Sequence, residues 1–207
     1  MVPDSDSPSS LGHGGLVSGD AVAAFTCRGV RTALSVADLS RISRKYDLPG
    51  ELSIFMPLNP SDASAQGSGF VTLYEDALAA GLRIPLHPLA RSLLGYLGIA
   101  PGQLAPNGWR FLMGSAYLWP QLFGHELSLF ELLWAYQPFA LVGEVGFFSL
   151  SSRSGRKLID KCPSNNKGWK TRFFQVPTLR LCEDGPQSGG SLPMAWASGL
   201  SGKVPHW

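Results

Sequence analysis

A run of cations and aromatic residues between Arg153 and Arg172 is the part of this chain whose side chains best suit a defined chemistry. Its sequence, RSGRKLIDKCPSNNKGWKTR, holds seven of the seventeen Lys and Arg residues and one acid, Asp160. Cations that neutralise phosphates and rings that stack on bases are typical of surfaces that bind single-stranded nucleic acid. The expected contact residues, with RNA or DNA as the partner, are Arg153, Arg156, Lys157, Lys161, Lys167, Trp169, Lys170, Arg172 and Phe174.

The same charges also suit a structural role. Residues 47–144 hold eight acids against three Arg, so the basic segment has an acidic body on which to dock, or it lies in solvent. In an extended strand, Lys170 and Arg172 share one face with Phe174, whereas Trp169 lies on the other face. The residues by themselves leave both interpretations open.

The remaining polar residues form no recognised catalytic pattern. Glu75 and Asp76 are adjacent on an expected helix, where neighbouring side chains diverge by about 100° and do not converge on one ion. His87 precedes a proline at a helix entry, and His125 lies in an expected loop. Neither histidine has a nucleophile in a familiar arrangement beside it. We therefore expect no catalytic residue, no metal, no cofactor and no small-molecule ligand.

The three cysteines, Cys27, Cys162 and Cys182, are widely spaced and odd in number. This pattern fits free thiols in a reducing compartment and lacks the close grouping of a zinc knuckle. The first ten residues, MVPDSDSPSS, resemble no export signal, and the uncharged stretch between Arg110 and Glu126 is too short to span a bilayer. We expect a soluble intracellular protein without membrane contact, in the nucleus or the cytoplasm.

Elements that would position these side chains follow from the apolar spacing. A length of 207 residues with 44% hydrophobic composition suits one core, which we expect in a single domain over residues 35–177. Residues 1–34 are rich in Ser, Gly, Pro and Asp, which predicts a mostly disordered segment. Residues 178–207 have no apolar period, which predicts an irregular or disordered tail.

Several helices are expected in the first part of the domain. Ser35 and Asp38 have the spacing of a capping box, and an extended segment is expected over residues 52–56. Phe70, Leu73, Tyr74, Ala77 and Leu78 follow a helical period, which predicts a helix that ends near Gly81.

Prolines delimit the expected helices that follow. Pro88 and Pro106 each suit a first helical turn, and Pro120 is expected to kink or divide the second of these helices. Ser128 is expected to cap a last helix that Pro138 ends. Three β-prone runs then follow, FFSLSS, KLI and WKTRFFQV. The predicted fold is α+β: a small bundle of four or five short helices followed by a short antiparallel β meander or hairpin.

Longer stretches of the sequence resemble a known family. GFVTLYEDALAAGLRIPLHPLARSLLGYLGIAPGQLAPNGWRFLMG, and later SRSGRKLI and SNNKGWKTRFFQV, are similar to the plant family called the putative gypsy-type transposon domain. The resemblance covers about residues 52–176. It implies derivation from a long-terminal-repeat retroelement, and it transfers no catalytic residue.

Three functions are compatible with these observations. The first is a retrotransposon-derived, non-enzymatic, Gag-like assembly or interaction domain that contacts nucleic acid through residues 153–172. The second is a metal-dependent nuclease or transposase fragment, which only the family association suggests. The third is a pure protein-interaction or self-assembly module, suggested by the aromatic residues around Trp119 and Trp134.

Overall fold

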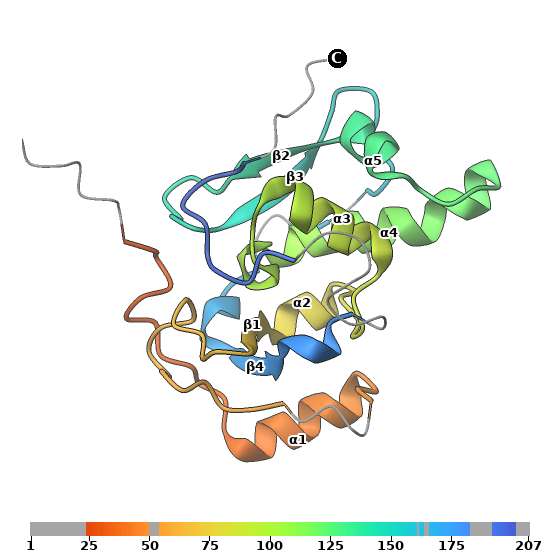
Figure 1. Ribbon diagram of the computed structural model, residues 1–207. Helices are drawn as coiled ribbons and strands as arrows, with labels where there is room; N and C mark the ends of the chain where they lie inside the picture. Colours follow the sequence, from red (N-terminus) through yellow and green to blue (C-terminus); the bar gives the residue numbers. More distant parts are fainter. Residues whose placement is uncertain (1–23, 50–53, 161, 164–165, 183–191, 202–207) are drawn as a thin grey trace, which may run out of the picture.

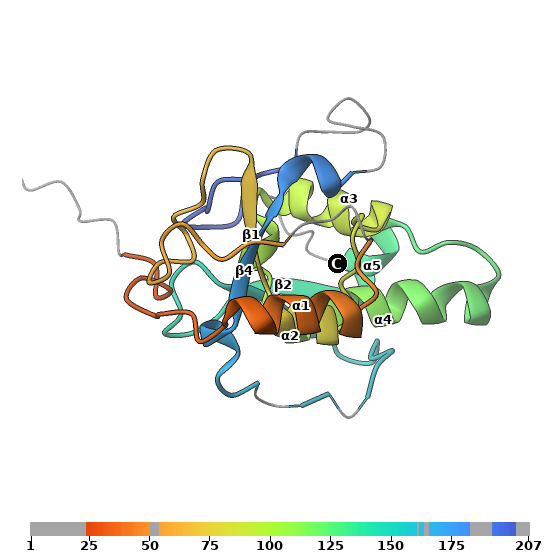
Figure 2. The ribbon, with the colours of Figure 1, turned by 90° about the horizontal axis from the view of Figure 1, so that it is seen from below.

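The computed structural model describes residues 24–49, 54–160, 162–163, 166–182 and 192–201 (Figure 1). Over these residues the chain has an α+β fold with five α-helices and two small antiparallel sheets, which confirms the predicted class. The sheet of β1 and β4 lies between α1 on one side and α2 with the remaining helices on the other, and the β2–β3 hairpin lies at the far side of α3 and α4 (Figures 1 and 2). The elements are α1 (Val36–Lys45), β1 (Phe70–Tyr74), α2 (Glu75–Ala79), α3 (Pro88–Leu97), α4 (Pro106–Phe123), α5 (Leu129–Ala135), β2 (Tyr136–Ala140), β3 (Phe148–Ser152) and β4 (Phe173–Pro177), with short 3-10 helices at Pro101–Gln103, Trp169–Thr171 and Thr178–Arg180.

Helix α1 begins at the expected capping box. The Asp38 N–H donates to Ser35 Oγ at 3.2 Å, and the Ser35 N–H donates to Asp38 Oδ2 at 2.9 Å. These reciprocal bonds satisfy two amides that the first helical turn leaves without a partner. The helix then packs Leu39 and Ile42 into the core.

The helix expected from Phe70 is wrong in its first half. Residues Phe70–Tyr74 form strand β1, and only Glu75–Ala79 are helical. β1 pairs antiparallel with β4, which places Val71 opposite Val176 and Leu73 opposite Phe174. Because this strand is buried on both faces, its apolar residues run without alternation, and such a run is equally compatible with a buried helix.

The last predicted helix is shorter than expected. α5 begins at its Ser128 cap but ends at Ala135, and Pro138 lies inside strand β2 instead of ending the helix. Pro138 pairs with Leu150 of β3 in a two-stranded hairpin, where an edge strand tolerates the missing backbone donor. Of the three β-prone runs predicted after the helices, FFSLSS supplies strand β3 of this hairpin, whereas its partner β2 comes from residues at the predicted end of the last helix.

The third β-prone run does not extend that hairpin. Its first residues, Trp169–Thr171, form a 3-10 turn, and β4 pairs with β1 about a hundred residues earlier in the chain. The KLI run is not a strand. Of the extended segment expected at 52–56, residues 52 and 53 lie outside the described part, and Phe55 bridges to Gln175 of β4.

Helix α4 is continuous over eighteen residues, so Pro120 does not divide it as expected. Pro120 lies in the last turn, where it removes one internal hydrogen bond and leaves little helix beyond it. Gly124 then ends the helix in the left-handed conformation, with its N–H donating to the Pro120 carbonyl at 2.9 Å. Pro88 and Pro106 open α3 and α4 as expected.

Both ends of the chain have described residues that contact the domain. Residues 24–34 make backbone hydrogen bonds to it, such as the one from the Ala33 N–H to the Thr171 carbonyl at 2.6 Å. The disorder expected for residues 1–34 is therefore not found over residues 24–34, and residues 1–23 lie outside the described residues. Residues 192–201 have no helix or strand, as expected for the tail, yet Leu192 is buried in the core.

Candidate interaction surfaces

The carboxyl-terminal end of the basic segment is bound to acids of the domain. The Nε and Nη2 atoms of Arg172 both lie 2.7 Å from Glu75 Oε2, and Nη2 lies 3.7 Å from Asp38. The Glu75 side chain is only 9% exposed, and its other oxygen faces Arg41 of α1 at 3.4 Å. Arg172 therefore joins β4 to α2 and α1, and its charge is neutralised within the domain.

Lys170 is neutralised in the same way. Its Nζ forms an ion pair with Glu144 and lies 5.2 Å from the centre of the Phe147 ring. Burial raises the pKa of the Glu144 carboxyl, but hydrogen bonds from Lys170 and Thr26 outweigh this effect and leave the pKa below its ordinary value. The carboxylate is thus held in its charged form beside the lysine.

The two aromatic residues expected to stack on bases are in the core. Phe174 is fully buried, and the Trp169 ring packs edge-on against Tyr74 and Phe147 at centroid distances of 4.6 and 5.0 Å. The expected strand face shared by Lys170, Arg172 and Phe174 does not form, because Lys170 lies in the 3-10 turn before β4. At this end of the segment, the contacts are those of the docked alternative.

The amino-terminal end of the segment packs on α5. Arg153 Nε donates to the Leu133 carbonyl at 3.2 Å, and Arg156 Nη1 donates to the Trp134 carbonyl at 2.8 Å. The guanidinium of Arg156 also lies 4.3 Å from the centre of the Trp134 ring. Both arginines cap the carboxyl end of α5, where a helix favours positive charge.

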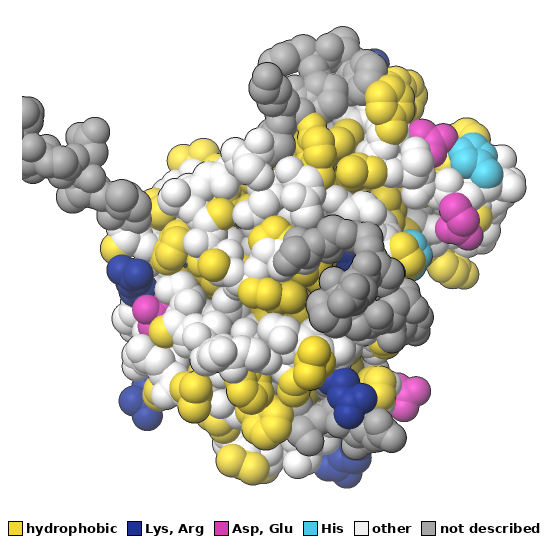
Figure 3. All heavy atoms as spheres, in the orientation of Figure 1, with side chains coloured by type: hydrophobic (Ala, Val, Ile, Leu, Met, Phe, Trp, Pro, Cys, Tyr) yellow, Lys and Arg dark blue, Asp and Glu magenta, His cyan; other side chains and the backbone are white. Residues whose placement is uncertain are grey.

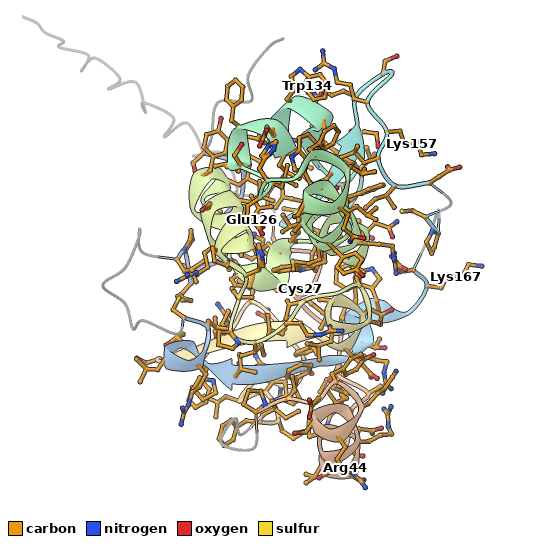
Figure 4. All side chains as sticks on the ribbon, turned by 90° about the vertical axis from the view of Figure 1, so that its right-hand side faces the viewer. Cys27, Arg44, Glu126, Trp134, Lys157 and Lys167 are labelled. Atoms are coloured by element: carbon orange, nitrogen blue, oxygen red, sulfur yellow. The ribbon has the colours of Figure 1, made fainter. Side chains whose placement is uncertain are left out.

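Between these two ends, the segment runs along the outside of the molecule. Lys157 pairs with Asp160 at 2.6 Å, and both Lys157 and Lys167 are exposed. Figure 4 shows both lysines pointing outward along the same edge. Lys161 lies outside the described residues.

A second surface lies at the carboxyl-terminal end of α4, which projects past the other elements (Figures 1 and 2). Here Leu122 is 63% exposed and Phe123 is 53% exposed. Phe123 continues the stripe that Trp109, Leu112 and Trp119 bury nearer the centre, and its ring lies 4.3 Å from that of Trp119. The apolar stripe of α4 therefore runs further than the core that covers it.

The turn between α4 and α5 is held by His125 and Glu131. His125 Nε2 lies 2.8 Å from Glu131 Oε1, and the other Glu131 oxygen accepts from the backbone and hydroxyl of Ser128. The hydrogen bond with Glu131 raises the pKa of His125 above 6.5. The bonds from Ser128 and then His125 lower the pKa of Glu131 to about 2.

We call this surface the α4–α5 tip. Figure 3 shows hydrophobic, acidic and histidine side chains together over this part of the molecule. In the sequence analysis, only the aromatic residues around Trp119 and Trp134 indicated this surface. The apolar period of α4 also continues beyond Pro120, and this signal would have indicated Leu122 and Phe123. The large exposed apolar residues of the tip are Leu122, Phe123 and Phe130, and Tyr117 and Trp134 are exposed further along the same two helices.

The acids suggested by sequence do not form a metal site among the described residues. No group of three or more His, Cys, Asp and Glu side chains is placed there to hold an ion. Glu75 is instead occupied by cations, and burial beside Glu75 raises the pKa of Asp76. In the same part of the chain, no helix has the length and apolar character needed to cross a bilayer.

Comparison with known proteins gives one match. Residues 71–137 match the sequence profile of the family described as "Putative gypsy type transposon". No curated protein and no solved structure matches the chain. The matched stretch runs from β1 to the start of β2, so it contains the whole α4–α5 tip and none of the basic segment. The family resemblance expected from the sequence is thereby confirmed over residues 71–137.

Proposed function

We propose that the chain is a non-enzymatic, Gag-like assembly domain derived from a retrotransposon, and that it self-associates through the α4–α5 tip. The observation that supports this most is the uncovered apolar stripe at the end of α4. Scattered exposed apolar residues are ordinary, whereas a contiguous group on a projecting helix end is typical of interaction sites. The tip lies within the segment that matches the transposon family.

The charges around the tip support a contact between like copies. Glu126 is exposed on the tip, whereas Arg156 stacks on Trp134 at the other end of α5. When two copies of α5 lie antiparallel across a two-fold axis, the acidic end of each faces the basic end of the other. An isologous interface needs such self-complementarity.

Sedimentation velocity of the full chain over a range of concentrations tests the proposal. We expect reversible association that the double variant Leu122→Ser/Phe123→Ser abolishes. Val142→Ser is the matched control, because Val142 is 98% exposed and lies in the β2–β3 turn. The proposal is wrong if the wild type stays monomeric, or if the double variant associates as the wild type does.

A second candidate function is nucleic-acid contact through the exposed part of the basic segment. It is favoured by the outward direction of Lys157 and Lys167 along one edge (Figure 4). Arg153 and Arg156 lie at the start of the same segment. Trp169, Lys170, Arg172 and Phe174 do not take part in this version, because their rings are buried and their charges are paired.

Fluorescence anisotropy with labelled single-stranded RNA and duplex DNA across a salt series tests the second candidate. We expect affinity that falls steeply with salt and that Lys157→Ala/Lys167→Ala weakens, with a salt slope lower by about 0.7–0.9 for each phosphate that a removed lysine neutralised. Arg44→Ala is the matched control, since Arg44 is an exposed cation of α1 far from this edge (Figure 4). Equal binding by both variants would exclude the basic segment as the binding surface.

A further inference from the structure

The described part of the carboxyl-terminal tail, residues 192–201, lies against the domain as a curved segment with bends at Ala195, Ser198 and Gly199 (Figure 1, indigo). Its centre is held by the side-chain amide of Gln103, which is fully buried. Gln103 Nε2 donates to the Ala197 carbonyl at 2.6 Å, and the Ala197 N–H donates to Gln103 Oε1 at 2.8 Å. One amide side chain thus pairs with both backbone groups of one residue, as a neighbouring strand would.

Two more contacts hold the backbone of this segment. Gln66 Nε2 donates to the Met194 carbonyl, while Gln66 Oε1 accepts from the Thr72 N–H. Near the end of the segment, the Ser201 N–H donates to the Leu97 carbonyl at 2.9 Å. These hydrogen bonds hold the tail at three points. Residues 192–201 themselves form no helix and pair in no sheet.

One side chain of the segment packs between two aromatic rings of the domain. The Trp196 ring lies edge-on to Phe25 and Phe147, at centroid distances of 5.5 and 5.2 Å. Gly102 lines the approach, because a Cβ there would meet the Thr72 carbonyl at 2.6 Å and Trp196 Cζ2 at 3.6 Å. A large ring that fills a pocket is a common anchor residue in peptide recognition.

A second glycine leaves room for the end of the segment. Gly98 caps α3 in the left-handed conformation, and a Cβ there would lie 2.1 Å from Ser201 Oγ. The domain therefore approaches the segment closely at two glycines, Gly102 near the tryptophan and Gly98 near its end.

The fit at the anchor is incomplete. Trp196 Nε1 is buried without a hydrogen-bond partner. An unpaired buried donor costs about 1–3 kcal/mol, which offsets part of the gain from burying the ring. The segment is therefore bound less tightly than its hydrogen bonds and ring contacts suggest. When the segment leaves, the Trp196 N–H can donate a hydrogen bond to water.

We propose that this groove is a peptide-recognition site for a segment with tryptophan between small residues, and that residues 192–201 of a second copy can replace the chain's own. Each copy carries both the groove and the peptide, so a second copy is the partner whose chemistry fits. The chain's own tail competes with that of a second copy at an effective concentration on the order of millimolar. Exchange of tails between copies is therefore expected only where the protein is highly concentrated, as in an assembly. The site lies away from the α4–α5 tip (Figure 1), so it is tested separately from the proposed function.

The test uses a fluorescent peptide of sequence LPMAWASGLS, which is residues 192–201, titrated by anisotropy into full-length protein. Trp196→Ala in the full-length chain removes the anchor of the attached tail and leaves the groove intact. We expect the peptide to bind this variant at least about tenfold more tightly than it binds the wild type, because the competitor is weakened. A peptide with the same Ala substitution is expected to bind neither protein.

A second full-length variant, Ala197→Pro, removes the N–H that donates to Gln103 but keeps Trp196. We expect it to bind the peptide about three- to tenfold more tightly than the wild type, the effect of one hydrogen bond in the competing tail. Circular dichroism and urea unfolding establish that each variant is folded. The proposal is overturned if a folded variant binds the peptide no better than the wild type, or if both variants unfold, since the tail is then an integral part of the core.

Discussion

The carboxyl-terminal end of the basic segment and the α4–α5 tip reverse the roles that their residue types suggest. Lys170 and Arg172 are cations beside aromatic residues, yet they face Glu144 and Glu75, and the rings beside them are buried. Leu122 and Phe123 are apolar, yet they lie on the outside of a projecting helix. Residue type alone therefore does not identify an interaction surface; the exposure of the side chains in the fold does. A cation that is paired with an acid inside the domain exerts only a weak electrostatic attraction on a partner.

The largest expected difference is in the free energy of unfolding of two variants, Phe174→Ala in the core and Phe123→Ala at the tip. Phe174→Ala is expected to lower the free energy of unfolding by about 3–5 kcal/mol, because it empties a fully buried site in β4. Phe123→Ala on the tip is expected to cost less than about 1 kcal/mol. Urea unfolding at equilibrium measures both. Similar costs for the two variants would remove the distinction between core and tip.

The ion pair of Arg172 gives the next largest effect. Glu75→Ala is expected to lower the free energy of unfolding by about 1–3 kcal/mol, because it leaves Arg172 without its main partner at a site where the carboxylate is buried. Glu126→Ala removes an exposed acid of the tip and is expected to change stability by less than about 0.5 kcal/mol. If Glu75→Ala were as stable as the wild type, the basic segment would not be docked through this pair.

The smallest expected effect is the pH dependence of the tip. The raised pKa of His125 stabilises the folded turn below pH 6.5, and this contribution is lost as the pH rises through the raised value. The lowered pKa of Glu131 stabilises the turn above pH 4.5, and that contribution is lost as the pH falls toward about 2. The turn is therefore held best between pH 4.5 and 6.5.

Proton NMR titration of His125 measures this effect. We expect a pKa above 6.5 in the wild type, and Glu131→Gln is expected to return it toward 6.5. An unchanged His125 pKa in the variant would show that Glu131 does not hold the turn.

Local signals in the sequence predicted the local parts of the fold. The Ser35 and Asp38 capping box, the prolines at Pro88 and Pro106, and the cap at Ser128 act within one or two turns of their own position, and each marked the correct start of a helix. Their physical causes are contained in a few consecutive residues.

The incorrect predictions concern segments whose secondary structure or burial depends on residues that are distant in the sequence. Phe70–Tyr74 is a strand because β4 supplies its hydrogen bonds, and no pattern within residues 70–78 reveals that partner. The burial of Trp169 likewise depends on Tyr74 and Phe147. For the candidate site, composition located the cations, but only the three-dimensional arrangement pairs them with acids or leaves them exposed.

Hydrogen–deuterium exchange of the full chain at low and high protein concentration tests directly whether the protein assembles through the α4–α5 tip. Assembly through the tip predicts that amides of residues 117–134 exchange more slowly at high concentration, while those of residues 166–177 do not change. Double Ser substitution at Leu122 and Phe123 should remove this dependence. Exchange that is independent of concentration at the tip, or protection confined to the basic segment, would contradict the account.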